Sequence, residues 1–414
     1  MPKLPDTGPA DTGPISLWRN RSFVRLWFAR AVSSIGTQVT SLALPLTAIT
    51  LLDATPIQIG YLGIASRAPS LLFDLFAGVW IDRTQRRPIL VGADLGRALL
   101  LGTIPLAALL GYLTFAQLYL VTFLVGILTT FFSLASISIL PSLVKRGELV
   151  EANSKLAATD SVLSIAAPGM AGGLIQFLSA PKAILLDALS YLLSMFSLHG
   201  MSAPEKPSNI TARASIWTEI GEGIYELVRT PILRALAISV SIGTFGLVMQ
   251  EAVLLLYFVD DLEFTPATIG FIGAVSGVGA LVGALNSGWV ARYLGIGPTI
   301  ILGNFLWAIG VIIIPLVGAN LLLISGGQIV AKIGAAIWSV NQMSLRQSIT
   351  PVHLFARATA ARRVLMIGLQ IIGAALGGLL GTVIGFQATL IIGSAGLMIG
   401  SLFLVSSPVR TASV

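Results

Sequence analysis

Long apolar runs alternate with short polar connections along almost the whole chain. About 20 apolar residues, each adding about 1.5 Å of rise, cross the hydrocarbon core of a bilayer as a helix. Runs of that length lie near residues 23–51, 57–80, 88–111, 117–140, 156–178, 182–201, 232–258, 267–290, 298–317, 320–344, 359–383 and 387–406. The pattern therefore predicts an all-α integral membrane protein with twelve transmembrane helices.

Lysine and arginine gather in alternate connections. Those on one side of the predicted membrane include Lys3, Arg19, Arg21, Arg25, Arg83, Arg86, Arg87, Lys145, Arg146, Lys206, Arg213, Arg229, Arg292, Arg346 and Arg357. The connections on the other side contain neither residue, with Lys182 just beyond one of them: 52–56, 112–116, 179–181, 259–266, 318–319 and 384–386. Cytoplasmic loops concentrate these basic residues. We therefore expect both termini on the cytoplasmic side of a bacterial inner membrane.

The composition supports a membrane protein and narrows its chemistry. Hydrophobic residues make up 55% of the 414 residues and charged residues only 10%, whereas about a quarter of a soluble domain is charged. The basic loops account for the net charge of +7, so we expect no nucleic-acid partner. The chain has no cysteine, and its two histidines, His199 and His353, lie near predicted span ends. We therefore expect no metal site, no cofactor and no enzymatic activity.

The segment 202–231 is the longest polar stretch, and it divides the spans into six and six. It contains an amphipathic run from Trp217 to Val228, which predicts a surface helix within a cytoplasmic linker. We therefore expect an N-terminal six-helix half over 1–201, the linker over 202–231, and a C-terminal six-helix half over 232–414.

The two halves share a sequence repeat. Residues 56–66 read PIQIGYLGIAS and residues 266–276 read PATIGFIGAVS, a constant offset of 210. Glycine pairs also recur in the fifth and eleventh spans, at 172–173 and 377–378. Two halves in the same orientation are the layout of carriers that bind substrate between parallel repeats. The repeat therefore favours a carrier that works by alternating access.

A glycine, an Asp-Arg pair and an Arg-Arg pair follow one another after the second span, as Gly78, Asp82, Arg83, Arg86 and Arg87. The glycine permits close helix contact. Asp82 lies at a helix C-terminus, where the macrodipole disfavours an anion, so it needs a compensating positive group. The arginines are also explained as topology signals alone, and that alternative stays open.

This motif resembles the loop signature of the major facilitator superfamily, which stands at the same place after span two of twelve. The resemblance implies a major facilitator fold of two six-helix halves. It also implies that Asp82 contacts the start of span eleven, near Thr359, and so forms a conformational latch of the outward-open state. Asp94 and Arg97, three residues apart on span three, are expected to pair and to serve this latch.

We expect Asp82→Asn to reduce transport severalfold while leaving membrane insertion intact. The substitution removes the charge that the start of span eleven would hold, but it changes no apolar residue on which insertion depends. Flux through the reconstituted protein, compared at equal protein content, measures the effect. An unchanged flux would leave the loop arginines as topology signals only.

Stretches throughout the chain look like the macrolide-efflux and siderophore-export branch of that superfamily: 36–46, 94–100, 140–156, 187–194 and 344–351. The resemblance implies a proton-driven exporter. In the fifth span, Pro168, Gly169, Gly172 and Gly173 are similar to the antiporter motif of the superfamily, with alanine at two of its glycine positions.

Ionisable residues within the spans are candidate coupling groups, because a charge in the bilayer core is unfavourable. Arg67 and Asp74 lie seven residues apart on one face of span two, and Asp160 is an acid at depth in span five. Either a structural ion-pair cluster around Arg67 or a proton or cation site explains these three. Glu251 in span seven is the first choice for coupling, since a carboxylate removed from water exchanges protons near neutral pH. Polarity at the extracellular rim is its alternative.

Spans one, four, seven and ten resemble the cavity-lining set of the superfamily. Their polar and aromatic residues are cavity candidates, namely Gln38, Gln250, Lys332, Asn341 and Trp338. We expect a monomeric secondary transporter whose partners are a small-molecule substrate, protons and the lipid bilayer. Proton-coupled efflux of hydrophobic or amphipathic compounds is the first hypothesis. A lysophospholipid or other lipid carrier, and a non-transporting sensor or assembly partner on a transporter fold, are the alternatives.

Overall fold

The computed structural model describes residues 17–201 and 216–412, and the regular elements in those ranges are all helical. Within the helices, some side chains also lie outside the description: those of residues 75, 78, 79, 82, 83, 146, 216–220, 352, 353 and 356. The first six helices are α1 (Arg21–Leu52), α2 (Pro56–Arg83), α3 (Arg86–Leu110), α4 (Phe115–Leu143), α5 (Leu149–Leu178) and α6 (Ala180–His199).

A shorter helix, α7 (Ile216–Arg229), precedes six more long helices. These are α8 (Pro231–Leu256), α9 (Pro266–Leu294), α10 (Ile296–Leu316), α11 (Leu321–Ile349), α12 (Val352–Val383) and α13 (Phe386–Val405). A π-helical turn over Tyr257–Asp261 continues α8. The amphipathic run predicted within the linker therefore does form a helix.

Among the described residues, eleven helices are long and apolar enough to cross a membrane. They are α1, α3 to α6 and α8 to α13. α2 is as long, with 28 residues, but Arg67 and Asp74 interrupt its apolar sequence. The chain is therefore a multi-pass helical membrane protein, as predicted, whereas the count of twelve spans stays a prediction.

Helix ends fall where the local sequence supplies capping groups. The Asn20 side chain accepts hydrogen bonds from the first free amides of α1, at Ser22 and Phe23. α2 and α9 begin alike, with a threonine cap followed by Pro56 or Pro266, whose missing N–H is harmless in a first turn. α5 and α12 each begin about seven residues before the predicted spans, on the side of the basic loops. Polar residues continue these helices beyond the apolar runs.

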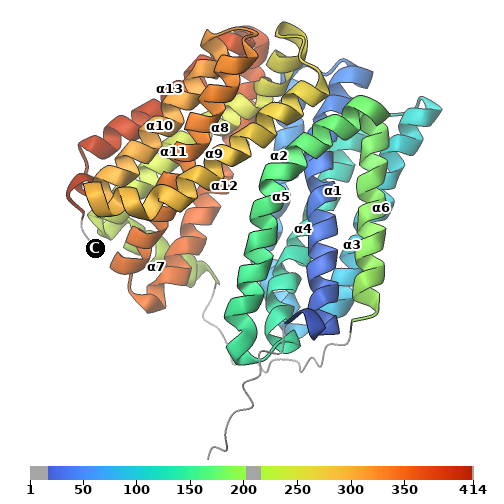
Figure 1. Ribbon diagram of the computed structural model, residues 1–414, viewed down its shortest axis with the longest axis horizontal. Coiled ribbons are helices and arrows are strands. Elements are labelled where there is room, and N and C mark those ends of the chain that lie inside the picture. Colours follow the sequence, from blue (N-terminus) through green and yellow to red (C-terminus); the bar gives the residue numbers. More distant parts are fainter. Residues whose placement is uncertain (1–16, 202–215, 413–414) are drawn as a thin grey trace, which may run out of the picture.

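The long helices form two groups, which Figure 1 shows side by side. In one group α6 packs on α1 and α3, and α2 packs on α4; in the other, α10 packs on α11 and α8 on α13. Short connections make successive helices antiparallel. α2 and α9 therefore begin, and α5 and α12 end, at the end of the molecule with the uncharged connections, here called the neutral end. The opposite end, where α1 and α8 begin, is called the basic end.

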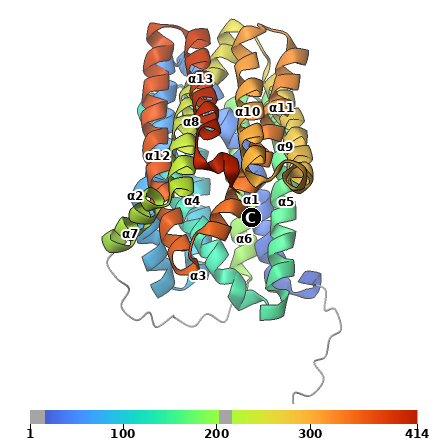
Figure 2. The ribbon, with the colours of Figure 1, turned by 90° about the vertical axis from the view of Figure 1, so that its left-hand side faces the viewer.

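α7 packs on α12 and α8, and Figure 2 shows it beside α12. A Cβ added to Gly223 would lie 2.3 Å from the carbonyl oxygen of Arg357, so only glycine permits this approach. Glu222 forms an ion pair with Arg357 on the same contact. The connecting segment is thereby fixed to the C-terminal helices in its described part.

Candidate functional site

The hydrophobic cores of the two groups merge at the neutral end. Leu256 of α8 is buried in the core of the N-terminal helices, and Leu42 of α1 packs against the core of the C-terminal helices. At the basic end, the described residues form separate cores, one from 17–201 and two from 216–412. The two groups are therefore packed together at the neutral end and have independent cores at the basic end.

A glycine contact between α5 and α9 closes one side of the neutral end. A Cβ added to Gly172 would lie 2.4 Å from the carbonyl oxygen of Pro266 and 2.7 Å from the Cα of Gly270. The two backbones touch because neither glycine carries a side chain. Gly173 has nothing within 4 Å of its Cβ position, so it faces away from this contact.

The rest of the predicted antiporter-type motif lies along the same contact. A Cβ added to Gly273 of α9 would lie 2.7 Å from the Cβ of Pro168. One added to Gly169 would lie 3.1 Å from the Cβ of Ala274. Three of the four motif residues, Pro168, Gly169 and Gly172, therefore contact the other group of helices.

A second glycine contact, between α2 and α12, closes the other side. A Cβ added to Gly60 would lie 2.7 Å from the carbonyl oxygen of Ala374, and one added to Gly378 would lie 2.8 Å from that of Pro56. Gly60 and Gly270 occupy the same position of the repeat, at the offset of 210. The repeat thus supplies equivalent glycines to two equivalent contacts, which together form what we call the seam.

Arg67 and Glu251 form an ion pair across the seam, from α2 to α8. Arg67 also donates to the carbonyl of Gly63, one turn earlier, at 3.2 Å. The Glu251 side chain is 58% exposed and that of Arg67 is 24% exposed. Protein therefore leaves the carboxylate uncovered, while the guanidinium is held beside it.

Asp74 forms a second ion pair between the halves, nearer the basic end than the seam, with Arg363 of α12 at 2.8 Å. The predicted cluster of Asp74 and Asp160 around Arg67 is therefore wrong. Seven residues along a helix separate two backbones by about 10 Å, whereas α8 and α12 pack directly on α2. Arg67 and Asp74 each reach an opposite charge on the other half instead.

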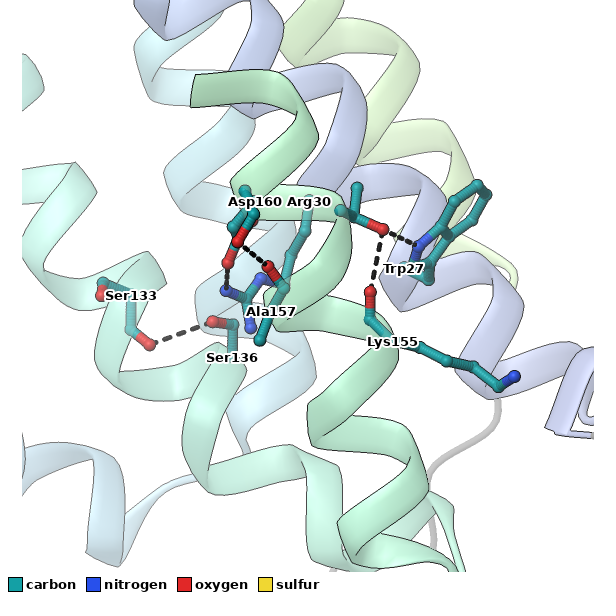
Figure 3. A network of polar contacts seen from close by, with 9 residues as sticks. Trp27, Arg30, Ser133, Ser136, Lys155, Ala157 and Asp160 are labelled. Carbon is teal, nitrogen blue, oxygen red and sulfur yellow. Dashed lines mark hydrogen bonds and ion pairs between the residues drawn. The ribbon is translucent and has the colours of Figure 1, made fainter. Parts of the chain in front are cut away.

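Asp160 belongs to a contact inside the N-terminal half. Its carboxylate lies 3.2 Å from the Arg30 guanidinium, and this pair joins α5 to α1 (Figure 3). Nearby, Trp27 donates to the hydroxyl of Thr159 at 2.8 Å. Both interactions link helices of one half, so a movement of one half against the other leaves them in place.

Asp94 and Arg97 form a buried ion pair on α3, as their spacing predicts. The Asp94 carboxylate accepts a hydrogen bond from Ser194 of α6 at 2.5 Å. The Arg97 guanidinium lies 4.2 Å from the ring centres of both Phe132 and Tyr191. The pair is thus enclosed by helices of the N-terminal half, and its service to the latch stays a prediction.

Of the other predicted latch residues, Gly78, Asp82 and Arg83 lie outside the described residues. Arg86 begins α3. Arg87 donates to the carbonyls of Leu198 and His199 at the end of α6. Arg87 therefore ties two helices of the same half together, in addition to marking the basic end.

The place predicted for the Asp82 contact carries two arginines that sequence reasoning did not assign to the site. Arg346 of α11 is 3% exposed and donates to the Thr359 hydroxyl at 2.9 Å. Arg362, one turn further along α12, is close enough to repel it. Neither has an ion pair within the described part of the chain. The sequence predicts Arg346 as a loop charge, and it gives Arg362 and Arg363 no role because they lie inside the apolar run 359–383.

Two of the predicted cavity residues are hydrogen-bonded to protein acceptors. Gln250 is 4% exposed and donates to the Ser394 hydroxyl of α13 at 2.7 Å, so it joins two helices of one half. Asn341 is also 4% exposed and donates to the carbonyl of Ile337 on its own helix, at 2.8 Å. In this structure both amides therefore turn to protein acceptors, as amides in an apolar surrounding do, and their contact with a substrate cavity stays a prediction.

The remaining cavity candidates differ in exposure. The ring of Trp338 packs against Trp307 of α10, with 5.7 Å between ring centres. Gln38 is half-buried and Lys332 is exposed. No acid among the described residues forms an ion pair with Lys332. Gln38 and Lys332 therefore remain predicted residues of the substrate cavity.

Two halves that share a packed core at the neutral end and form separate cores at the basic end, within the described part of the chain, suit a protein that exposes a site alternately at its two ends. A family model described as "Transmembrane secretion effector" matches residues 12–414. The multidrug efflux pump Tap of Mycolicibacterium fortuitum is 26% identical over 374 residues, which cover 87% of this chain and 90% of that protein. The enterobactin exporter EntS of Shigella boydii is 26% identical over 385 residues, covering 91% and 89%.

The fold is also similar to that of known transporters. The crystal structure of a bacterial homologue of the iron transporter ferroportin, in its inward-facing state, has a TM-score of 0.75 and 16% identity, with 94% of this chain and 98% of that one covered. The chain therefore belongs to the transmembrane secretion effector family of major facilitator transporters, and it is a membrane transporter with efflux homologues, not an enzyme.

Proposed function

We propose that this protein is a monomeric, proton-coupled exporter of small hydrophobic or amphipathic compounds in the bacterial inner membrane. The observation that carries the proposal is the Arg67–Glu251 ion pair, which crosses the seam and leaves the carboxylate uncovered by protein. The names of Tap and EntS, both efflux proteins, support the direction of transport.

The basic end is cytoplasmic in this proposal, because lysine and arginine prefer cytoplasmic loops. The structure then corresponds to an inward-facing state, in which the seam is closed at the extracellular end. In the outward-facing state the seam opens and the basic end closes. Arg346 and Arg362 supply the positive charge that Asp82 needs as a latch there, since both are buried or half-buried without an ion pair among the described residues.

The Arg67–Glu251 pair couples proton movement to this exchange. An opposite charge nearby favours the ionised form of a carboxylate. When the seam opens, Arg67 moves away and Glu251 takes up a proton from the outside. When the seam closes, Arg67 returns and the proton leaves towards the cytoplasm. Each cycle therefore brings a proton inwards as the opposite movement carries substrate out.

We expect Glu251→Gln to reduce gradient-driven efflux on the order of tenfold, the factor that about 1.4 kcal/mol represents. Glutamine keeps the shape of the side chain but neither ionises nor pairs fully with Arg67. Efflux of a panel of dyes, drugs and a lysophospholipid from proteoliposomes, with and without a proton gradient, measures the effect. Asp261→Asn, at the exposed end of the same span, is the matched control and should retain full activity.

Two further variants separate coupling from simple packing. Arg67→Glu combined with Glu251→Arg restores an ion pair across the seam. If the pair serves only to hold the halves together, this double variant should recover full efflux. The proposal predicts folded protein without recovery of gradient dependence. Wild-type flux that ignores the gradient would remove proton coupling, and loss of coupling in Asp160→Asn but not in Glu251→Gln would move it to Asp160.

A further inference from the structure

Asp187 of α6 lies at a point where three helices of the N-terminal half meet. The residue is 1% exposed. A Cβ added to Gly36 of α1 would lie 2.1 Å from its Oδ1 atom, so any larger residue there would displace the carboxyl. α3 packs against α6 on the other side. The contacts of Asp187 do not cross the seam, because the helices around it all belong to one half.

The charges that face Asp187 are Asp94 and Arg97 of α3, and Tyr191 is the other titratable group beside it. Arg97 already forms an ion pair with Asp94 and lies between two aromatic rings. One guanidinium therefore stands between two carboxyl groups. With both carboxyls ionised, this buried cluster would carry one net negative charge.

The hydrogen bonds around Asp187 also indicate that its carboxyl is not satisfied as an anion. Its Oδ1 accepts a hydrogen bond from Ser190 at 3.1 Å. Its Oδ2 is buried without a hydrogen-bond partner, although a buried carboxylate normally has several. Thr40 of α1 lies beside the carboxyl, and its buried hydroxyl is a hydrogen-bonding group that faces it. A hydrogen on Oδ2 could be donated to the Thr40 hydroxyl oxygen, which would give both buried atoms a hydrogen-bond partner.

We propose that Asp187 is a proton-binding site, occupied in this inward-facing state and separate from the Arg67–Glu251 pair. The bound proton makes the Asp94–Arg97–Asp187 cluster neutral, which removes the electrostatic penalty of burying a second carboxylate in the membrane. It sits on Oδ2, where it completes the hydrogen bonding. α1, α3 and α6 can then pack on the carboxyl without water.

Infrared spectroscopy of the purified full-length protein in lipid nanodiscs tests the site, because a protonated carboxyl has its own C=O stretching band. At neutral pH the wild-type protein should show a carboxylic-acid band that is absent from Asp187→Asn and retained in Asp160→Asn and Asp261→Asn, whose carboxylates lie outside the Asp94–Arg97–Asp187 cluster. Thr40→Val should shift the frequency of the same band, since it removes the group beside the protonated oxygen. If Asp187→Asn fails to fold, the frequency shift in Thr40→Val still tests whether the band belongs to Asp187.

The assignment is overturned if the band persists in Asp187→Asn, if it disappears in Asp160→Asn or Asp261→Asn, or if the wild-type protein shows no such band. A Thr40→Val spectrum identical to that of the wild type would also contradict it. The measurement needs neither substrate nor a proton gradient. A failure of proton-coupled efflux therefore leaves the result intact, and a negative spectrum leaves the Glu251 proposal standing.

Discussion

Gly172→Ala should shift the protein away from the inward-facing state and strongly reduce transport, whereas Gly173→Ala should leave both unchanged. The added Cβ at position 172 would lie 2.4 Å and 2.7 Å from backbone atoms of α9, which cannot rotate out of the way. Overpacking of this kind costs about 1–3 kcal/mol. If the seam separates in the other state, the conformational equilibrium moves by about 5- to 150-fold.

The natural chain has no cysteine, which makes the measurement direct. Cysteines introduced at Phe177 on α5 and Glu263 before α9, both exposed near the neutral end, accept a pair of spin labels. The distance distribution between them should lengthen in Gly172→Ala and match the wild type in Gly173→Ala. Efflux should fall in the first variant only. Equal distances and equal efflux in both variants would show that the seam is not a moving contact.

Asp94→Ala should destabilise the folded protein by about 3–5 kcal/mol, because it leaves the Arg97 guanidinium buried without its partner. Both side chains are almost completely covered, at 0% and 3% exposure. Thermal unfolding in detergent, together with the yield of monodisperse protein, measures the loss. Asp160→Ala is the matched control, since it breaks an ion pair whose carboxylate is 49% exposed. That loss should be at most about 1 kcal/mol.

The double variant Asp94→Ala with Arg97→Met distinguishes an unpaired charge from a simple cavity. Replacing both partners of a buried pair by apolar groups is often neutral, so the double variant should recover most of the stability lost by Asp94→Ala. If the double variant is less stable than the single one, the loss comes from packing around Phe132 and Tyr191, and the electrostatic explanation is wrong.

Most of the fold could be predicted from the sequence, because a helix in lipid is a local property. Every backbone group in the bilayer must be satisfied within its own segment. An apolar run such as 117–140 therefore specifies a helix without reference to the rest of the chain, and α4 (Phe115–Leu143) follows it closely. The repeat at an offset of 210 also pointed to the two glycines, Gly60 and Gly270, that now define the seam.

The pairing of charges could be predicted only where both partners lie on one helix. Asp94 and Arg97, three residues apart, pair as expected. Arg67 was expected beside Asp74, but each has its partner on a helix more than 150 residues away, at Glu251 and Arg363. Spacing along one helix says which face a side chain occupies, not which neighbouring helix covers that face.

The sequence by itself determined that the protein is a helical membrane carrier of two related halves. Span length, loop charge and the internal repeat are properties of local sequence and can be read without the tertiary structure. The tertiary structure alone decided which end is closed, which glycines touch, and that Gln250 and Asn341 donate to protein acceptors. It also placed Asp187 against Gly36 and Arg97. These facts depend on how helices dock, and docking is set by contacts between residues that are distant in sequence.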